Sequence, residues 1–430
     1  MIRRLSLLLS VILSMSHAMA VDTGNMVTPR FRSLQVTVDG NELAPPVITL
    51  NSDDKLTIAF DELAEDRSYL RYSLVHCDAS WQPSGLVESE YLDGFNQADV
   101  EDYSFSRSTT VHYVHYSVTL PNRHMTMTLS GNYMMRVYSE DDPEVNLLQA
   151  RFSVSESKVR INGEASSRTD TGSDNGNQQL SFTVDASGVD VKNMLSDLKV
   201  VVSRNGRTDD VVMLESPQRI NGRIAYYEHL RNLIFPGGNE YRRFENTSVD
   251  FPTMGVESID YEYPYYHVTL FRDAPRVGEQ YRYDSTQHGR FKVREYNSDD
   301  SNVEADYTIT HFTLDMPELY DYDIYIDGDM TCRRFSPESM MRYDAESSSY
   351  RGALLLKQGA YNYQYLAVPK GGKRGVQTCA LPICGKRGVT SVIEGDCHPT
   401  VNEYLVSVYY REPGARYDRL LGSTVIYSGY

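Results

Sequence analysis

Short runs of alternating apolar and polar residues, separated by turn residues, follow one another along most of the chain. Leu34, Val36 and Val38 form one such run, which ends at Asp39-Gly40, a pair typical of a tight hairpin turn. No long stretch has the 3.6-residue period of an amphipathic helix. The pattern therefore predicts an all-β protein built from tandem immunoglobulin-like β-sandwich domains.

Tyrosine is the dominant aromatic residue, with 33 Tyr against 13 Phe and one Trp. It suits half-buried strands, because its ring packs while its hydroxyl reaches backbone or solvent. Gly131-Asn132-Tyr133 and Gly359-Ala360-Tyr361 each open an alternating run, as in a tyrosine corner, where the hydroxyl bonds to backbone a few residues upstream. Two copies of this device predict at least two sandwiches of related design.

Turn-rich polar segments divide the chain into predicted parts. The polar segment 298–302, Ser-Asp-Asp-Ser-Asn, is interpreted as a linker. The predicted parts are a signal peptide at 1–20, an N-terminal immunoglobulin-like β-sandwich at 21–155, a middle β domain at 156–300 and a C-terminal β-sandwich at 301–430.

The first twenty residues have the pattern of a secretory signal peptide. Arg3 and Arg4 precede a short apolar run from 5 to 15, which is too short to span a bilayer. Ala18-Met19-Ala20 supplies the small residues that signal peptidase requires, so we expect cleavage after Ala20. No later run is long and apolar enough for a transmembrane helix, which predicts an exported protein that does not span the membrane.

The net charge of −17 argues against binding to nucleic acid or to an anionic membrane surface. Export permits disulfides, but five cysteines cannot all pair within one chain. Setting Cys379 and Cys384 aside leaves Cys77, Cys332 and Cys397, whose pairing the sequence leaves open.

Those two cysteines lie in a segment that does not match its surroundings. Gly-Lys-Arg-Gly-Val occurs at 372–376 and again at 385–389, and the peptide from 376 to 383 resembles the translation of a common sequencing adapter. We therefore suspect the 376–389 region, and residues 377–389 in particular, of being a sequence artefact within a hairpin loop. The alternative is a genuine surface loop with a Cys-x4-Cys pair, which resequencing of the locus would decide.

Residues that suggest chemistry do not converge in the sequence. His112 and His115 are three apart in a predicted strand and so face opposite sides, and His76-Cys77-Asp78 is expected at a strand end. The aspartates at 321, 323, 327 and 329 lack calcium-loop spacing and are interpreted as a charged edge and hairpin turn. No hydrolase, metalloprotease or nucleotide-binding motif occurs. The chain is therefore predicted to be no enzyme, with no catalytic residues, metal or cofactor.

The segment 235–244 is the strongest candidate for protein recognition. It joins a Pro-Gly-Gly turn to Tyr, Arg and Phe, the residue types that dominate binding hot spots. The candidate residues are Phe235, Gly238, Asn239, Glu240, Tyr241, Arg242 and Phe244. The alternative is an internally packed loop that bridges two modules. Trp81 is a second candidate, either an exposed anchor or a residue that fills the core.

Several strings together resemble one family. They are His76-Cys77-Asp78, Trp81-Gln82-Pro83-Ser84, 90–96, 114–116, 235–244, 304–307, 311–312, 356–359, 402–404 and 416–422. This combination resembles the type IX secretion system plug protein family over nearly the whole chain, and it departs from the family pattern at 376–389.

The resemblance implies a periplasmic protein associated with the outer membrane through a protein partner. That partner is the large outer-membrane β-barrel translocon, whose periplasmic opening the plug closes when no substrate is present. The family supplies no catalytic residues, and neither nucleic acid nor a small-molecule substrate is implied. The alternative function is a carbohydrate-binding or hydrolase-accessory β-sandwich protein, because the Gly-x-Tyr-x-Tyr-x-Tyr strand from 359 to 365 is similar to such modules. That alternative requires an exposed aromatic platform.

Overall fold

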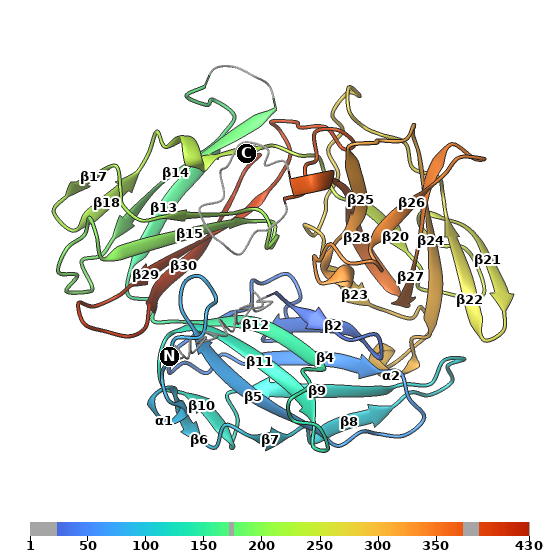
Figure 1. Cartoon of the computed structure of the whole chain (residues 1–430), viewed down its shortest axis with the longest axis horizontal. Coiled ribbons are helices and arrows are strands. Elements are labelled where there is room, and N and C mark those ends of the chain that lie inside the picture. The colour runs from blue at the N-terminus through green and yellow to red at the C-terminus, as the bar shows by residue number, and fades with distance from the viewer. Residues whose placement is uncertain (1–23, 172–175, 373–386, 430) are drawn as a thin grey trace, which may run out of the picture.

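The computed structural model describes residues 24–171, 176–372 and 387–429 and shows three β domains arranged as three lobes (Figure 1). Its helices are single turns: α1 (Glu88–Tyr91), α2 (Ser301–Glu304), η1 (Arg231–Leu233), η2 (Asp329–Thr331) and η3 (Lys370–Gly372). The predicted all-β fold of β-sandwich domains is confirmed. No helix among the described residues has the length and apolar character needed to cross a bilayer. The predicted signal peptide and its cleavage site at Ala20 lie outside the described residues.

The first domain packs two main sheets around one core. One sheet has the order β1 (Met26–Val27), β12 (Leu148–Ser155), β11 (Gly131–Ser139), β5 (Leu70–Cys77), β7 (Ala98–Asp99), and β3 (Val47–Thr49) pairs with β12. The other sheet has the order β2 (Phe31–Val38), β4 (Leu56–Glu62), β9 (Val114–Leu120), β8 (Asp102–Phe105), and a separate pair joins β10 (Met125–Met127) to β6 (Leu92–Gly94). Alternate residues of β5 and β9 are buried, as the period of two requires.

The second domain is also a two-sheet sandwich, but its strands come from distant parts of the chain. One sheet has the order β13 (Arg160–Ser166), β14 (Asn177–Asp185), β18 (Ile224–Tyr227), β17 (Arg219–Asn221), with β19 (Ile234–Pro236) paired to β14. The other has the order β16 (Val211–Leu214), β15 (Leu198–Arg204), β29 (Glu403–Tyr410), β30 (Arg419–Tyr427). Residues from all of these segments except β13 and β17 contribute buried side chains to one hydrophobic core, against which Ile161 and Ala165 of β13 and Ile220 of β17 pack.

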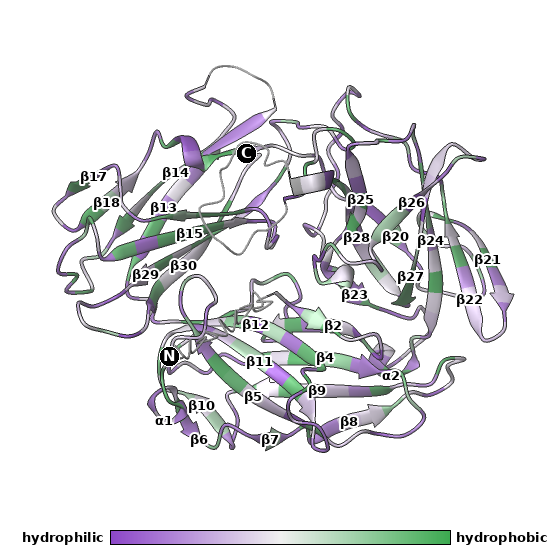
Figure 2. Cartoon of the chain, viewed as in Figure 1, coloured by the Kyte–Doolittle hydropathy of each residue, from purple (hydrophilic) through white to green (hydrophobic). Residues whose placement is uncertain are grey.

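The third domain is built from a single nine-stranded sheet. Its order is β20 (Arg242–Glu245), β28 (Gly359–Pro369), β25 (Tyr322–Asp327), β26 (Met340–Asp344), β27 (Ser349–Lys357), β24 (Tyr307–Asp315), β22 (Tyr265–Leu270), β21 (Val256–Glu262), with β23 (Phe291–Val293) paired to β28. One core includes residues from both ends of this sheet, such as Phe244 and Val256. Apolar and polar segments alternate along strands of all three domains (Figure 2).

Strand pairing corrects the predicted boundary at residue 300. The strands from β20 to β23, predicted for the middle domain, belong to the third domain. The predicted linker at 298–302 lies within that domain and includes the start of α2. The last two strands return to the second domain, where Leu198–Arg204 pairs with Tyr404–Tyr410. Alternation in the sequence indicates which face of a strand is buried but not which distant strand lies beside it, so the linear division was wrong here.

Both predicted tyrosine corners are confirmed. The hydroxyl of Tyr133 donates to the carbonyl of Leu129 at 2.8 Å, and the hydroxyl of Tyr361 donates to the carbonyl of Lys357. Each tyrosine is buried and bonds four residues upstream, at the turn that leads into its own strand. The same device therefore fixes the entry into β11 in the first domain and into β28 in the third.

Replacing Tyr133 with Phe is expected to lower the free energy of unfolding by about 1–2 kcal/mol, because the partly buried carbonyl of Leu129 loses its donor. Chemical denaturation followed by circular dichroism measures this loss. Tyr69, which is largely exposed, is the control, and its change to Phe should leave stability unaltered. Equal stabilities of the Tyr133→Phe variant and the wild type would contradict a structural role for the hydroxyl.

Candidate functional site

Buried charged side chains gather where the domains meet. Between the first and third domains, the ammonium of Lys357 lies 2.6 Å from the carboxylate of Asp61, and each side chain is only 1% exposed. Asp61 also accepts hydrogen bonds from the hydroxyl of Tyr307 at 2.6 Å and from Nδ1 of His115 at 2.7 Å. Burial alone would raise the pKa of Asp61, but Lys357 and His115 outweigh it and hold that pKa below its ordinary value.

A second carboxylate joins the same two domains. Asp306, which precedes β24, accepts hydrogen bonds from the backbone and hydroxyl of Thr110 at 2.7 and 2.6 Å and from the backbone of Val111 at 3.1 Å. Nearby, the buried hydroxyl of Tyr113 donates to the carbonyl of Ala305 at 2.8 Å. The loop before β9 is thus held against the third domain by contacts that a relative movement would break.

The first and second domains meet around Glu156, directly after β12. Its carboxylate accepts hydrogen bonds from Arg419 at 2.7 and 2.8 Å and from the hydroxyl of Ser130 at 2.7 Å, and it forms an ion pair with Lys158 at 2.8 Å. Burial opposes ionisation, but these donors outweigh it and lower the pKa of Glu156 to about 2. In the same junction, the hydroxyl of Tyr409 donates to the side chain of Asn132 at 2.8 Å.

The second and third domains share a similar contact. Arg290, just before β23, donates both terminal nitrogens to Glu403 at the start of β29, at 3.0 and 2.7 Å. Both side chains are largely buried. Bidentate arginine–carboxylate pairs impose a defined geometry as well as charge neutrality. Every pair of domains is therefore joined by buried polar contacts with specific orientations.

The candidate recognition loop at 235–244 lies inside this arrangement and not on the surface. Phe235 belongs to the second core, with its ring 5.1 Å from that of Tyr404, and Phe244 belongs to the third core, stacked at 5.1 Å on Tyr361. The loop carries the chain from one core to the next. The alternative of an internally packed bridge therefore describes it, and the predicted binding role is corrected.

The polar residues of the loop are bonded internally. Asn239 donates to the carbonyl of Glu394 at 2.8 Å, and the hydroxyl of Tyr241 accepts from Gln364 and Arg333 at 3.0 and 3.2 Å. The remaining contacts are Gly238 to Asp396, Glu240 to Val401, and Arg242 to Glu394 and Asp273. These partners lie far along the chain, which explains why the loop looks exposed in the sequence.

Trp81 is neither an exposed anchor nor a core residue. It is half-buried in a turn after β5, with a positive φ of 63°, and the guanidinium of Arg151 lies 4.3 Å from its ring centroid. A cation over an indole face is a favourable contact, so Trp81 packs against its own domain.

Of the other sequence predictions, the strand end at His76-Cys77-Asp78 is confirmed, whereas those for His112 and Asp327 are wrong. His76-Cys77-Asp78 does mark a strand end, because β5 stops at Cys77. His112 lies before β9 and not in a strand, and it contacts Glu65 at 2.6 Å. Asp327 is not on a charged edge, since its strand β25 lies between β28 and β26 and its carboxylate is buried beside Gln364. The described cysteines, Cys77, Cys332 and Cys397, form no disulfide.

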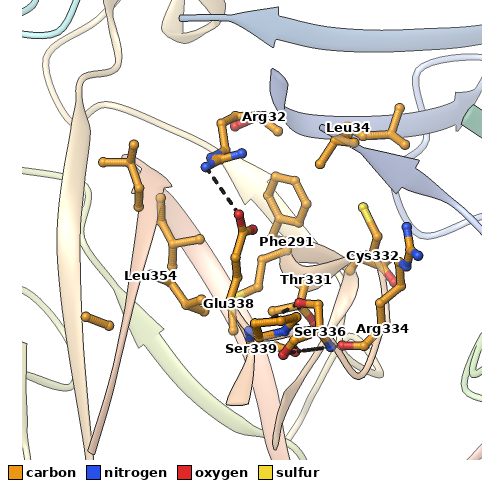
Figure 3. A pocket seen from close by; sticks show the side chains of 18 residues that line it. Arg32, Leu34, Phe291, Thr331, Cys332, Arg334, Ser336, Glu338, Ser339 and Leu354 are labelled. Atoms are coloured by element: carbon orange, nitrogen blue, oxygen red, sulfur yellow. Dashed lines mark hydrogen bonds and ion pairs between the residues drawn. The ribbon is translucent and has the colours of Figure 1, made fainter. Parts of the chain in front are cut away.

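A cavity of about 520 Å³ lies between the first and third domains (Figure 3). Its lining combines the apolar side chains of Leu34, Phe291 and Leu354 with Arg32 and Glu338, whose charged groups are 3.9 Å apart. No histidine of the described chain lines it, so its described lining contains no Ser-His or Cys-His pair for nucleophilic catalysis. Within the described ranges, no three His, Cys, Asp or Glu side chains come together to hold a metal ion.

The tyrosines of β28 do not form an aromatic platform. Tyr361, Tyr363 and Tyr365 are all buried in the third core, and the hydroxyls of Tyr363 and Tyr365 both donate to Asp273, at 2.8 and 2.7 Å. A stacking surface for a sugar must be open to solvent, so this strand offers no support for carbohydrate binding.

Most of the suspected artefact, residues 373–386, lies outside the described residues. The end of its second Gly-Lys-Arg-Gly-Val copy is described and contacts the second domain. Arg387 pairs with Asp210 at 2.5 Å, and the backbone of Gly388 donates to Asp209 at 2.8 Å. These contacts involve only the second copy, so the artefact hypothesis stays a prediction.

His288 makes the domain junction sensitive to acid. It is buried beside Arg290 and Arg333, and burial together with these cations lowers its pKa to about 4, although Glu403 opposes the shift. In the unfolded chain its pKa is about 6.5, so the unfolded state binds the proton first as the pH falls. Acidification from pH 7.5 to 5 is therefore expected to cost about 2 kcal/mol through this residue.

Urea denaturation of the wild type and of His288→Gln at both pH values measures this effect. The variant should lose about 2 kcal/mol less than the wild type on acidification. The same loss in both proteins would assign the acid sensitivity to other groups. Carboxylates with lowered pKa, such as Glu156, lose their contribution only as the pH falls from their unfolded values, near 4, toward about 2.

The first domain and the whole chain each resemble known proteins. Residues 31–156 match the family model of the type 9 secretion system plug protein 1st domain, a range that corresponds to the first sandwich. A crystal structure of a hypothetical protein from Parabacteroides merdae is 38% identical, covers 94% of this chain and 99% of its own, and superposes with a TM-score of 0.89. No curated protein matches the chain.

Two other solved structures have little sequence or structural similarity to this chain. An alkylpurine DNA glycosylase of Pseudomonas fluorescens is 14% identical over 29% of this chain and 30% of its own, with a TM-score of 0.18. A serine-rich repeat adhesion glycoprotein of Streptococcus agalactiae is 9% identical over 93% and 97%, with a TM-score of 0.13. At such scores neither describes this fold.

Proposed function

The chain belongs to the type 9 secretion system plug protein family, and from this premise we propose that it closes the periplasmic opening of the secretion barrel whenever no substrate occupies it. It does so by shape and not by chemistry. The protein is exported to the periplasm and held at the outer membrane through its contact with the barrel.

The observation that carries this proposal is the joining of three sandwiches into one body. A protein that blocks a wide pore must resist deformation, because separation of its parts would open a path between them. Each domain pair here is held by buried polar contacts, centred on Asp61 with Lys357, on Glu156 with Arg419, and on Arg290 with Glu403. Such contacts are directional, and separating the domains would break them and expose the paired groups to water.

The placement of the charged groups also supports a non-catalytic role. Two carboxylates, Asp61 and Glu394, have a lowered pKa. Both are paired with cations inside domain junctions or cores, where no substrate could reach them. Catalytic carboxylates instead face a cleft. Burial and ion pairing within the fold thus account for the lowered pKa of these two carboxylates.

Two measurements test the proposal. Affinity isolation of the protein from membranes in mild detergent should recover the large outer-membrane barrel as a partner. A strain without the gene should have an outer membrane that is permeable to a large hydrophilic antibiotic, which the intact outer membrane excludes. Reintroducing the gene should restore the barrier. A deletion strain with unchanged permeability and unchanged protein export would overturn the proposed function.

A further inference from the structure

The β21–β22 hairpin lies at one edge of the sheet of the third domain. β21 is the last strand of the nine-stranded sheet, and its only partner in the described sheet is β22. The two strands lie at the outer edge of the molecule in Figure 1, away from the second domain. Residues 260–264 at the turn of this hairpin are all exposed. An edge strand of this kind offers unpaired backbone groups to a partner.

Tyrosine side chains are concentrated at the turn. Tyr263 is 86% exposed and Tyr261 is 53% exposed, and the ring of Tyr261 packs against that of Tyr266 at 4.8 Å. Tyrosine is among the residues that dominate protein interfaces, because its rigid ring buries a large area and its hydroxyl still bonds to a partner. Elsewhere an exposed tyrosine such as Tyr69 already packs with a cation of its own domain, Arg67, at 4.7 Å.

The charge of the hairpin has one sign. Residues 256–270 include Glu257, Asp260 and Glu262 and contain no Lys or Arg. These carboxylates are exposed, and none of them forms an ion pair with a Lys or Arg among the described residues. A surface with three exposed carboxylates, of which only Glu262 lies near a histidine, His267 at 3.9 Å, favours a partner whose contact surface is basic.

We propose that this hairpin is the contact with the secretion barrel, and that it binds a part of the periplasmic rim that carries Lys or Arg side chains. The inference rests on the proposed function and adds to it the surface that makes the contact. The tyrosines supply the buried area at the centre of the interface, and the carboxylates supply steering and register.

A second copy of this chain is the other occupant to consider, since an open edge strand can pair with itself. Self-pairing of β21 would bring Glu257, Asp260 and Glu262 of one copy alongside the same acidic strand of the other. Like charges directly opposite one another destabilise a strand pair. The acidic edge therefore disfavours self-association and selects a basic partner.

The test compares two variants with the same change in net charge. The hairpin variant is Glu257→Lys with Asp260→Lys and Glu262→Lys, and the control is Asp141→Lys with Asp142→Lys and Glu144→Lys. The control residues are exposed in the β11–β12 turn of the first domain, and none forms an ion pair in the described chain. Thermal unfolding verifies that both variants fold.

Binding of each protein to the purified, detergent-solubilised barrel is then measured. The hairpin variant should bind at least tenfold more weakly than the wild type, and the control should stay within threefold. Equal affinity of the hairpin variant and the wild type would overturn this inference and leave the proposed function standing. An equal loss in both variants would also overturn it, because a general charge effect would then explain the binding. A wild type that does not bind the barrel at all would overturn the proposed function itself.

The contribution of the tyrosines is tested separately, with substitutions that leave the net charge unchanged. Tyr261→Ser combined with Tyr263→Ser should weaken binding to the same barrel at least tenfold, while Tyr320→Ser should not. Tyr320 is 77% exposed in the β24–β25 loop of the same domain and is the matched control. Salt should weaken wild-type binding more than it weakens any residual binding of the charge-reversed hairpin. If the tyrosine variants bind the barrel as tightly as the wild type does, the hairpin turn does not lie at the centre of the interface.

Discussion

Replacing Lys357 with Met is expected to lower the free energy of unfolding by about 3–5 kcal/mol. Met fills a similar volume without a charge, so the change removes the ion pair with Asp61 together with the hydrogen bond from Lys357 to the carbonyl of Asn302. The carboxylate would remain buried at the junction of the first and third domains, with only His115 and the hydroxyl of Tyr307 as donors. Burying an unpaired charge is among the few single changes that destabilise a protein this strongly. Denaturation in urea, followed by far-UV circular dichroism, measures the loss.

The double variant Lys357→Met with Asp61→Asn provides the control. It removes both charges, so it should recover more than half of the stability that Lys357→Met loses. If the loss in the single variant stays below 1 kcal/mol, or if the double variant is as unstable as the sum of the two single variants, the pair does not join the domains. In a deletion strain, the single variant should restore the permeability barrier less well than the double variant does.

The parts of the fold that depend on neighbouring residues were accessible from the sequence. Alternation predicted the strands, and both Gly-x-Tyr signatures predicted a hydroxyl bonded a few residues upstream, as Tyr133 and Tyr361 show. The division of the chain was not accessible, because β29 pairs with β15 across about half of the chain. The sequence records the face of each strand, whereas the choice among many possible partners depends on the whole set of packed faces.

The polar junctions were missed for a related reason. Asp61 and Asp306 are two of 59 acidic residues, and nothing local marks them as buried. Lys357 did carry a signal, since it follows three consecutive leucines in a predicted strand, where a buried lysine requires a partner. No role was predicted for the exposed hairpin at 256–270, although its four tyrosines and three carboxylates, without a Lys or Arg, are visible in the sequence.

Replacing Arg242 with Ala separates the two interpretations of the loop at 235–244. If this residue were part of a recognition surface, the change would weaken partner binding and leave stability intact. In the structure, its guanidinium donates to both oxygens of Glu394, at 3.1 and 3.0 Å, and pairs with Asp273 at 2.7 Å. Glu394 is fully buried and would keep only Arg276 as a cation. The expected loss is therefore about 3–5 kcal/mol in the free energy of unfolding.

The adjacent residue supplies the control, because Arg243 differs from Arg242 mainly in burial. Its side chain is 35% exposed and pairs with Asp284, itself 44% exposed, at 2.8 Å. An ion pair so open to solvent contributes less than about 1 kcal/mol, so Arg243→Ala should unfold almost as the wild type does. Urea denaturation of both variants decides the matter. Equal stability of the Arg242→Ala and Arg243→Ala proteins would contradict an internal role for the loop, whereas a loss confined to Arg242→Ala means that this segment holds the second and third cores together.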